Sequence, residues 1–279
     1  MARGTTAFRL VDTGRMSGVM NMALDEAILV HVAQAKSPPT VRFYAWQRPT
    51  LSLGYFQRYD RDVAEDNVRA KGFDLVRRMT GGRAVLHDRE LTYSVILPGN
   101  HEWAQASVVE SYHYMSRALR DGFRNLGVQA EMVTLAQEDK GKYPQADSAA
   151  CFDSPSAYEL VVGGKKIAGS AQVRAHGGLL QHGALLLDLD VDDLFAVLRF
   201  PTEERKARAQ SEFLERAVSV KHLTGRDVKW DEATSAFARG FQSGVGIRFV
   251  RQPILEEEWE LARRLADDKY RSEAWTKRR

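Results

Sequence analysis

Short connections between strand-like segments are the feature that most restricts how this chain can fold. Residues 158–162 and 165–173 both have strand character, and only Gly163-Gly164 separates them. A glycine pair of this kind supports the two-residue turn of a β-hairpin, whose strands are antiparallel. Parallel neighbours would need a crossover of about a dozen or more residues. The sheet is therefore predicted to be mixed or antiparallel.

Helical and strand periods alternate along the rest of the sequence. Further strands are predicted at 41–46, 51–56, 75–78, 84–87, 91–97, 129–133, 179–189 and 246–251. Helices are predicted at 19–35, with Ser17 as its cap, and at 60–71, 105–126, 192–199, 203–217, 231–244 and 255–272. The buried stripe of the third of these helices consists of Val108, Tyr112, Met115, Leu119, Phe123 and Leu126, with Gly127 as its stop. We expect an α/β (α+β) chain, with one domain over 1–279 and a helical C-terminal segment from about 231.

Composition excludes several classes of protein. The chain has 279 residues, 40 basic and 37 acidic side chains, a net charge of +3 and a single cysteine. It lacks an apolar signal core and a membrane-spanning stretch, and one cysteine cannot form an internal disulfide, so we expect a cytoplasmic protein. Neither a Cys-x-x-Cys pair nor a His-Glu-x-x-His helix occurs, so we expect no metal site. The short basic runs 206–208 and 277–279 indicate solvated surface or docking of an acidic partner, not nucleic-acid binding.

The single cysteine, Cys151, follows a long polar segment, 135–150, and precedes the predicted hairpin. Thiolate is a strong nucleophile, and a nearby cation such as Lys166 would lower the thiol pKa. A lone intracellular cysteine is more often a small buried residue, and a hairpin lysine is more often exposed. The segment alone therefore leaves a structural and a catalytic interpretation open.

A second segment, from Arg77 to His87, carries a glycine turn among cations. Thr80-Gly81-Gly82-Arg83 joins two predicted strands, and paired glycines leave room for close approach of a ligand. A plain hairpin turn is the simpler interpretation. The crowded cations at this turn, Arg77, Arg78 and Arg83, would repel one another unless anions or solvent surrounded them.

These motifs together resemble the lipoate-protein ligase and octanoyltransferase superfamily. Residues 77–94 contain Arg-Arg-x-Thr-Gly-Gly-Arg-x-Val-Leu-His-x-x-Glu-Leu-Thr-Tyr-Ser, and residues 166–172 read Lys-Ile-Ala-Gly-Ser-Ala-Gln. Residues 181–183, Gln-His-Gly, and 21–26, Asn-Met-Ala-Leu-Asp-Glu, also match. The resemblance covers about 8–275. It implies a biotin/lipoate ligase-like fold, with a large mixed sheet, a smaller sheet and flanking helices.

The branch of the superfamily depends on the cysteine. Lipoate ligases, which use ATP, typically have Asn-Asp where this chain has Cys151-Phe152-Asp153. The chain most resembles the cysteine-containing octanoyl-acyl carrier protein:protein N-octanoyltransferases, the LipM type. A cysteine amidotransferase that moves octanoyl between lipoyl-domain proteins is the first alternative, and an ATP-dependent ligase is the second. A non-catalytic lipoyl-domain binding protein is the third.

The resemblance implies a ping-pong acyl transfer in lipoate biosynthesis without ATP or metal. The donor is octanoyl-acyl carrier protein, the acceptor is an apo lipoyl-domain protein such as the glycine cleavage H protein, and the enzyme is expected to be a monomer. Cys151 is the implied nucleophile and Lys166 the implied catalytic lysine. The implied substrate-binding residues are Arg78, Gly81, Gly82, Arg83, His87, Gly169, Ser170 and His182. We hypothesise that His87 accepts the proton of the acceptor lysine.

Overall fold

The computed structural model describes residues 7–134 and 158–278, so Cys151 and the predicted loop 135–150 lie outside the described residues. Its largest sheet has six strands in the order β10-β11-β6-β2-β1-β12. These strands are β1 (Ala7–Met16), β2 (Thr40–Trp46), β6 (Leu91–Pro98), β10 (Ala168–Ala175), β11 (Gly178–Leu185) and β12 (Arg248–Arg251). Strand β1 is parallel to β2 and β12, and the other neighbours are antiparallel. The prediction of a mixed sheet is confirmed.

Strand β1 is absent from the sequence prediction. The residues Asp12-Thr13-Gly14 are typical of a turn, so the sequence pattern does not predict a continuous strand here. In the structure they form an irregularity in the strand, because the register with β2 shifts between Asp12 and Arg15 and Gly14 has a φ of 59°. A turn-like sequence here produces a bulge, and the strand continues beyond it.

Two smaller three-stranded sheets flank the large one, where a single smaller sheet was expected. One has the order β4-β3-β5, and the other β7-β8-β9. Their strands are β3 (Thr50–Leu53), β4 (Asp74–Arg77), β5 (Val85–His87), β7 (Glu131–Thr134), β8 (Tyr158–Val162) and β9 (Lys165–Lys166). Because β2 and β3 enter different sheets, the turn at Arg48-Pro49 joins two sheets instead of closing a hairpin.

The predicted hairpin across Gly163-Gly164 is confirmed at the turn, but the strand expected over 165–173 is split into β9, which completes the hairpin, and β10, which enters the large sheet. Strands β8 and β9 are antiparallel, and Val161 pairs with Lys166. Both glycines have positive φ, 55° and 78°, as a type I′ turn requires. This turn therefore fixes the register of Lys166 in the sheet.

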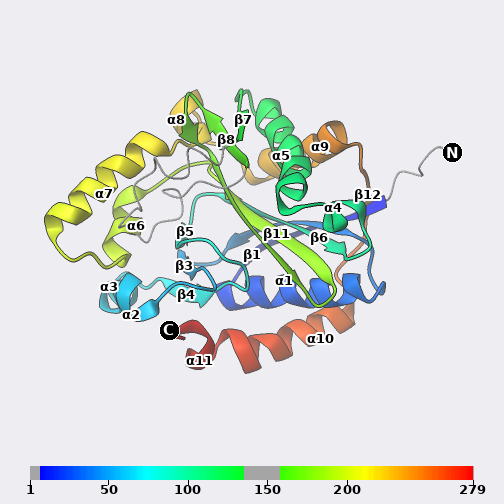
Figure 1. Cartoon of the computed structure of the whole chain (residues 1–279), viewed down its shortest axis with the longest axis horizontal. Coiled ribbons are helices and arrows are strands. Elements are labelled where there is room, and N and C mark those ends of the chain that lie inside the picture. Colours follow the sequence, from blue (N-terminus) through cyan, green and yellow to red (C-terminus); the bar gives the residue numbers. More distant parts are fainter. Residues whose placement is uncertain (1–6, 135–157, 279) are drawn as a thin grey trace.

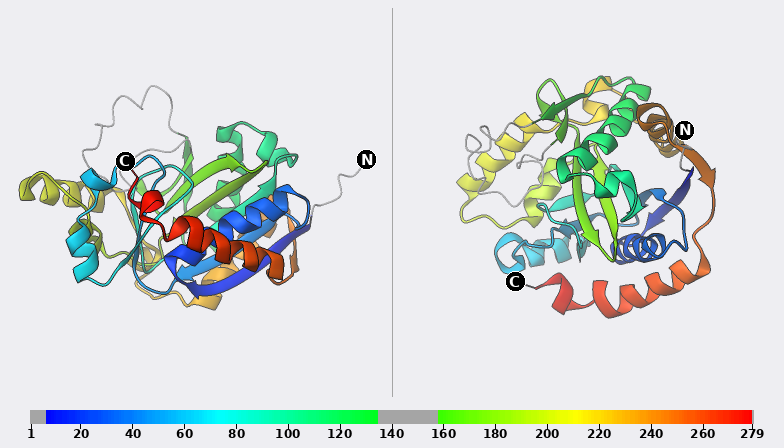
Figure 2. Two further views of the ribbon diagram at one scale, coloured as in Figure 1. Left: turned by 90° about the horizontal axis from the view of Figure 1, so that it is seen from below. Right: turned by 45° about the vertical axis from the view of Figure 1, so that its right-hand side comes forward.

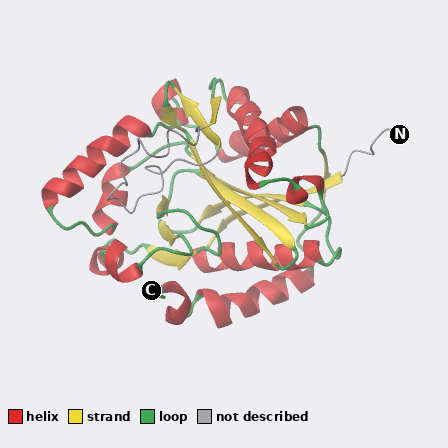
Figure 3. Ribbon diagram, viewed as in Figure 1, coloured by secondary structure: helices red, strands yellow, loops and turns green. Residues whose placement is uncertain are grey.

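Helices cover both faces of the large sheet (Figures 1 and 3). They are α1 (Gly18–Ala33), α2 (Tyr59–Asp62), α3 (Glu65–Ala70), α4 (Glu102–Gln105), α5 (Val108–Asn125), α6 (Val191–Val197), α7 (Glu203–Arg216), α8 (Val220–Thr224), α9 (Trp230–Val245), α10 (Glu256–Leu265), the π-helical turn η3 (Ala266–Tyr270) and α11 (Glu273–Thr276). Helices α1 and α10 lie side by side on one face, and α5 and α9 pack together on the other (Figure 2). None of the helices in the described part of the chain is long and apolar enough to cross a membrane.

Two helix predictions need correction. The helix expected over 60–71 is split into α2 and α3, because Val63 between them forms a β-bridge with Leu198. The apolar stripe of α5 is buried from Tyr112 to Leu126, but Val108 is 49% exposed at the first turn. The predicted cap of α1 is confirmed, since the Ser17 hydroxyl accepts a hydrogen bond from the Met20 N–H.

A buried ion pair ties the C-terminal helix α10 to strand β1. The guanidinium of Arg9 donates to both carboxylate oxygens of Glu258, at 2.8 and 2.7 Å. Ser37 and the Leu255 N–H also donate to this carboxylate, and Glu258 is fully buried. A pair that is buried and bidentate holds its partners strongly, since loss of one charge leaves the other without compensation.

We expect Glu258→Gln to lower the free energy of unfolding by about 3 kcal/mol, because it leaves the Arg9 guanidinium buried opposite a neutral amide. Glu256→Gln is the matched control on the same helix, since its ion pair with Arg263 is exposed. The control should change stability by no more than about 0.5 kcal/mol. Urea denaturation measures both, and equal effects of the two variants would contradict this assignment.

Candidate active site

The glycine turn of the signature segment lies between β4 and β5 and is held by Arg78. The guanidinium of Arg78 donates to the carbonyls of Gly81 and Arg83, at 3.1 and 2.9 Å. It also donates to the carbonyl and hydroxyl of Ser52 on β3, at 2.7 and 2.6 Å. We call residues 79–83 the signature loop. Arg78 therefore fastens the backbone of this loop to the small sheet.

A small cavity lies next to the signature loop, at the start of β10. It is lined by Met22, Tyr44, Trp46, Arg78, Val85, His87, Thr92, Gly169, Ser170, Ala171, His182, Gly183 and Ala184. Five residues of the implied binding set are among them. The structure thus brings together side chains from α1, the large sheet and the small sheet around one cavity.

The remaining members of the implied set belong to the loop and do not line the cavity. Gly82, with a φ of 90°, lies close to Ala171 of the cavity wall, since an added Cβ would be 3.9 Å from the Ala171 Cβ. Gly81 and Arg83 present their carbonyls to Arg78. The implied set missed the other lining residues. Of these, Met22, Val85, Thr92, Ala171 and Gly183 lie in the quoted motifs, whereas Tyr44, Trp46 and Ala184 had no signal.

The cavity is small in this structure. Its volume is about 20 Å³, room for about one water molecule, since roughly 10–15 Å³ open to a water is enough to hold it. An acyl chain can enter only if lining side chains move outward. The walls come from α1, β2, β5, β6, β10 and β11 and from Arg78, and Arg78 in turn holds the signature loop.

His87 forms part of the cavity wall and is held on both ring nitrogens. Its Nε2 lies 2.7 Å from the Ser52 hydroxyl, and its Nδ1 lies 2.7 Å from the Glu90 carboxylate. The ring stacks on Trp46, with a centroid distance of 4.0 Å. Burial lowers the pKa of His87 below its ordinary value, although Glu90 opposes this shift. These contacts favour a structural role for His87 over the hypothesised role of proton acceptor.

Lys166 lies just before the cavity strand β10. Its ammonium is 2.8 Å from the carboxylate of Glu159, and Lys166 is only 5% exposed. Glu159 precedes Val161 by two residues and so shares its face of the sheet, diagonal to Lys166. The hairpin thus presents a buried cation three residues ahead of Gly169. Cys151, the implied partner of Lys166, lies outside the described residues.

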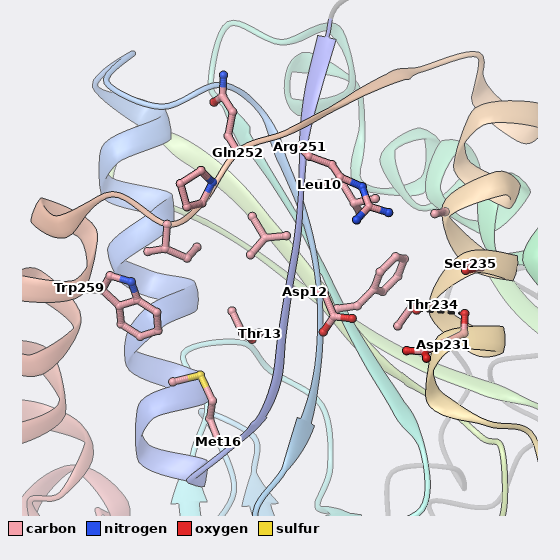
Figure 4. A pocket seen from close by; sticks show the side chains of 15 residues that line it. Leu10, Asp12, Thr13, Met16, Asp231, Thr234, Ser235, Arg251, Gln252 and Trp259 are labelled. Carbon is pink, nitrogen blue, oxygen red and sulfur yellow. Dashed lines mark hydrogen bonds between the residues drawn. The ribbon is translucent and has the colours of Figure 1, made fainter.

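A wider hollow lies elsewhere, along the outer edge of β1 between α9 and α10 (Figure 4). Its volume is about 780 Å³, and its polar lining includes Asp12 and Thr13 of β1 and Asp231 of α9. It contains none of the signature residues. Within residues 7–134 and 158–278, no group of three or more His, Cys, Asp or Glu side chains could hold a metal ion. The small cavity, which the signature residues surround, is therefore the candidate active site.

Comparison with known proteins identifies the family of the chain. Residues 17–242 match the family described as lipoyl protein ligase A/B catalytic domain. Octanoyltransferase LipM of Brevibacillus brevis is 49% identical over 273 residues, 98% of this chain and 99% of that protein. Octanoyltransferase LipM of Staphylococcus epidermidis is 44% identical over 276 residues, 99% of this chain and 100% of that protein.

A solved bipartite lipoate protein ligase from Thermoplasma acidophilum superposes with a TM-score of 0.78. It is 30% identical, and the match covers 98% of this chain and 96% of that one. The chain therefore belongs to the lipoyl protein ligase A/B catalytic-domain family, and the expected biotin/lipoate ligase-like fold is confirmed. Its full-length relatives at 44–49% identity carry the name octanoyltransferase LipM.

We expect Gly54→Ala to displace the signature loop. A Cβ at Gly54 would lie 1.9 Å from the carbonyl oxygen of Gly82. This clash is with backbone, so it can be relieved only by a shift of the loop and not by a change of side-chain rotamer. Overpacking of this kind costs about 1–3 kcal/mol, and thermal unfolding should reveal it. Gly81→Ala is the matched control in the loop, because its Cβ would meet only the Phe56 ring, at 3.9 Å. A Gly54→Ala protein as stable as Gly81→Ala would contradict the observed packing of the loop.

We also expect stability to fall below about pH 6.5. Burial lowers the pKa of His87, His101 and His182, so the unfolded chain takes up protons at these residues before the folded chain does. Stability is therefore complete above the unfolded histidine pKa and is lost as the pH falls, by at most about 1.4 kcal/mol per histidine and pH unit. Urea denaturation at pH 7.5 and 5.5 measures the change. Equal free energies of unfolding at the two pH values would contradict it.

Proposed function

We propose that this protein transfers an octanoyl group from octanoyl-acyl carrier protein to a lysine of an apo lipoyl-domain protein, through Cys151. The observation that carries the proposal is the buried Lys166, which the hairpin holds three residues before Gly169 of the small cavity. Full-length relatives named octanoyltransferase LipM support it. Cys151 is the single cysteine and precedes Tyr158 by seven residues. Seven residues span at most about 25 Å, so the tether allows the thiol to reach Lys166.

The first step exchanges one thioester for another. The Cys151 thiolate attacks the octanoyl carbonyl, the carbon–sulfur bond to the carrier breaks, and the carrier thiolate leaves and takes up a proton. This exchange is nearly balanced in free energy. The Lys166 ammonium increases the thiolate fraction of Cys151 and stabilises the oxyanion of the tetrahedral intermediate. No ATP is required, since the acyl group arrives already activated as a thioester.

The second step forms an amide. The neutral amine of the acceptor lysine attacks the acyl-Cys151 carbonyl, the carbon–sulfur bond breaks, and the Cys151 thiolate leaves. The amine loses a proton, which restores the protonation of the thiol. This step is downhill because an amide is more stable than a thioester, and two separate steps on one nucleophile give ping-pong kinetics.

An ATP-dependent ligase is the second candidate, because a solved lipoate protein ligase shares the fold at a TM-score of 0.78. Such an enzyme would activate a free acid and would need no cysteine. The sequence carries Cys151 where the resemblance to ligases would place Asn-Asp. We therefore favour transfer over ligation, with neither ATP nor metal as a cofactor.

We expect the protein to gain the mass of one octanoyl group when it is incubated with octanoyl-acyl carrier protein without ATP. Cys151→Ser should abolish this gain, because it removes the thiolate. Intact-mass spectrometry measures both. Lys166→Ala should slow acylation at least tenfold, since a buried electrostatic contact of this kind stabilises the oxyanion. Lys165→Ala, the adjacent control, should acylate normally, because its ammonium donates to the Leu214 carbonyl instead.

The other outcomes identify the alternatives. An adduct that forms only with an octanoylated lipoyl-domain donor would make the protein an amidotransferase. Product that requires free octanoate or lipoate with ATP and magnesium would make it a ligase. An adduct retained in Cys151→Ser would contradict the proposed nucleophile.

A further inference from the structure

The Asn-Met-Ala-Leu-Asp-Glu motif of α1 contains a buried carboxylate, Asp25, that has no role in the proposed acyl transfer. Asp25 is 1% exposed and faces the large sheet. Its Oδ1 accepts from the Arg42 guanidinium at 2.7 Å and from the Ser94 hydroxyl at 2.9 Å. Its Oδ2 accepts from the Tyr44 hydroxyl at 2.9 Å and lies 3.4 Å from Nδ1 of His182. Asp25 is therefore an acceptor for strands β2, β6 and β11 at once.

The charge of Asp25 fixes the tautomer of His182. Burial would raise the pKa of Asp25, but Arg42 and His182 together hold that pKa below its ordinary value, so the carboxylate is ionised. An ionised carboxylate only accepts hydrogen bonds, so Nδ1 of His182 carries the proton. Burial lowers the pKa of His182, which leaves its Nε2 as an acceptor. The Thr80 hydroxyl, 2.7 Å from Nε2, must therefore donate to it.

Thr80 belongs to the signature loop and is fully buried. Arg78 holds the loop through the carbonyls of Gly81 and Arg83, which fastens it to the small sheet. The bond from Thr80 to His182 fastens the same loop to the large sheet. Because His182 also lines the small cavity, this bond crosses beside the space that an acyl chain must enter.

We propose that Asp25, acting through His182, sets the position of the signature loop by the hydrogen bond from Thr80 to His182, and that Thr80 is a positioning residue for acyl transfer. The bond holds His182 directly, and it holds Arg78 through the loop carbonyls, and both of these side chains line the cavity of about 20 Å³. The loop position therefore sets the place of two walls of the space that the acyl chain occupies. The kinetic part of this inference rests on the proposed function, whereas the hydrogen bond and the loop position do not.

Thr80→Val tests the proposal, since valine keeps the shape of threonine and removes its hydroxyl. The Nε2 of His182 then stays buried without its donor, and the observed loop position is disfavoured by roughly tenfold. We expect the KM for octanoyl-acyl carrier protein to rise about tenfold, the rate of acylation at saturation to change less, and octanoyl to lose its preference over longer chains. Thr80→Ser keeps the hydroxyl and should restore wild-type values.

Thr40→Val is the matched control. Thr40 is fully buried on β2, and its hydroxyl accepts from Arg9 at 3.0 Å and donates to the Pro38 carbonyl at 2.9 Å, away from the cavity. It should lose stability as Thr80→Val does and keep KM and chain-length preference. If Thr80→Val also changes only stability, or if Thr80→Ser fails to restore KM, the proposal is wrong.

Two measurements need no activity and keep the proposal separate from the proposed function. Nitrogen-15 NMR of the histidine rings should show His182 protonated on Nδ1 and not on Nε2, and the reverse tautomer would overturn the proposal. Hydrogen exchange of the Gly81 and Gly82 amides should accelerate about tenfold in Thr80→Val and not in Thr40→Val. Unchanged exchange would overturn it even in a protein that transfers octanoyl groups, whereas inactivity of the wild type would count only against the proposed function.

Discussion

The buried carboxylate of Asp25 is the constraint on which the large sheet and the cavity both depend. A charge with almost no solvent contact must be met by donors, and these come from Arg42 and Tyr44 on β2, Ser94 on β6 and His182 on β11. Helix α1 can lie on the sheet in one position only, since rotation would leave the charge without compensation. Glu26, the next residue, binds Lys269 and Tyr270 of η3 and so joins the same helix to the C-terminal segment.

Arg77 and Arg78 of the signature segment donate hydrogen bonds mainly to backbone carbonyls. Their crowding suggested anions or solvent around them, but backbone carbonyls accept hydrogen bonds from the guanidinium groups of Arg77 and Arg78. Arg77 is fully buried and donates to carbonyls of Gly54 and Gln57 and to those of Trp275, Thr276 and Arg278 near the C-terminus. Arg78 binds the carbonyls within the loop. Adjacent arginines thus anchor the end of β4 and the loop that follows it.

Local signals in the sequence predicted most elements of the fold, and tertiary contacts decided the rest. Paired glycines fixed the hairpin and the register of Lys166, because turn geometry is a local property. The bulge of β1 and the break at Val63 depend on partners distant in sequence, β2 and Leu198, which no local pattern reveals. The motifs contain all the lining residues of the cavity except Tyr44, Trp46 and Ala184, and Tyr44 and Trp46 carry no signal because their strand is buried along its whole length.

The central claim is that the acyl chain occupies the small cavity beside the signature loop. A crystal structure of the protein after reaction with an 8-bromo-octanoyl donor tests it most directly, since the anomalous signal of bromine locates the end of the chain. The claim predicts bromine among Trp46, His87 and His182, with the signature loop displaced or re-closed over the chain. Bromine in the wider hollow between β1 and α9, near Asp12 and Asp231, would contradict it.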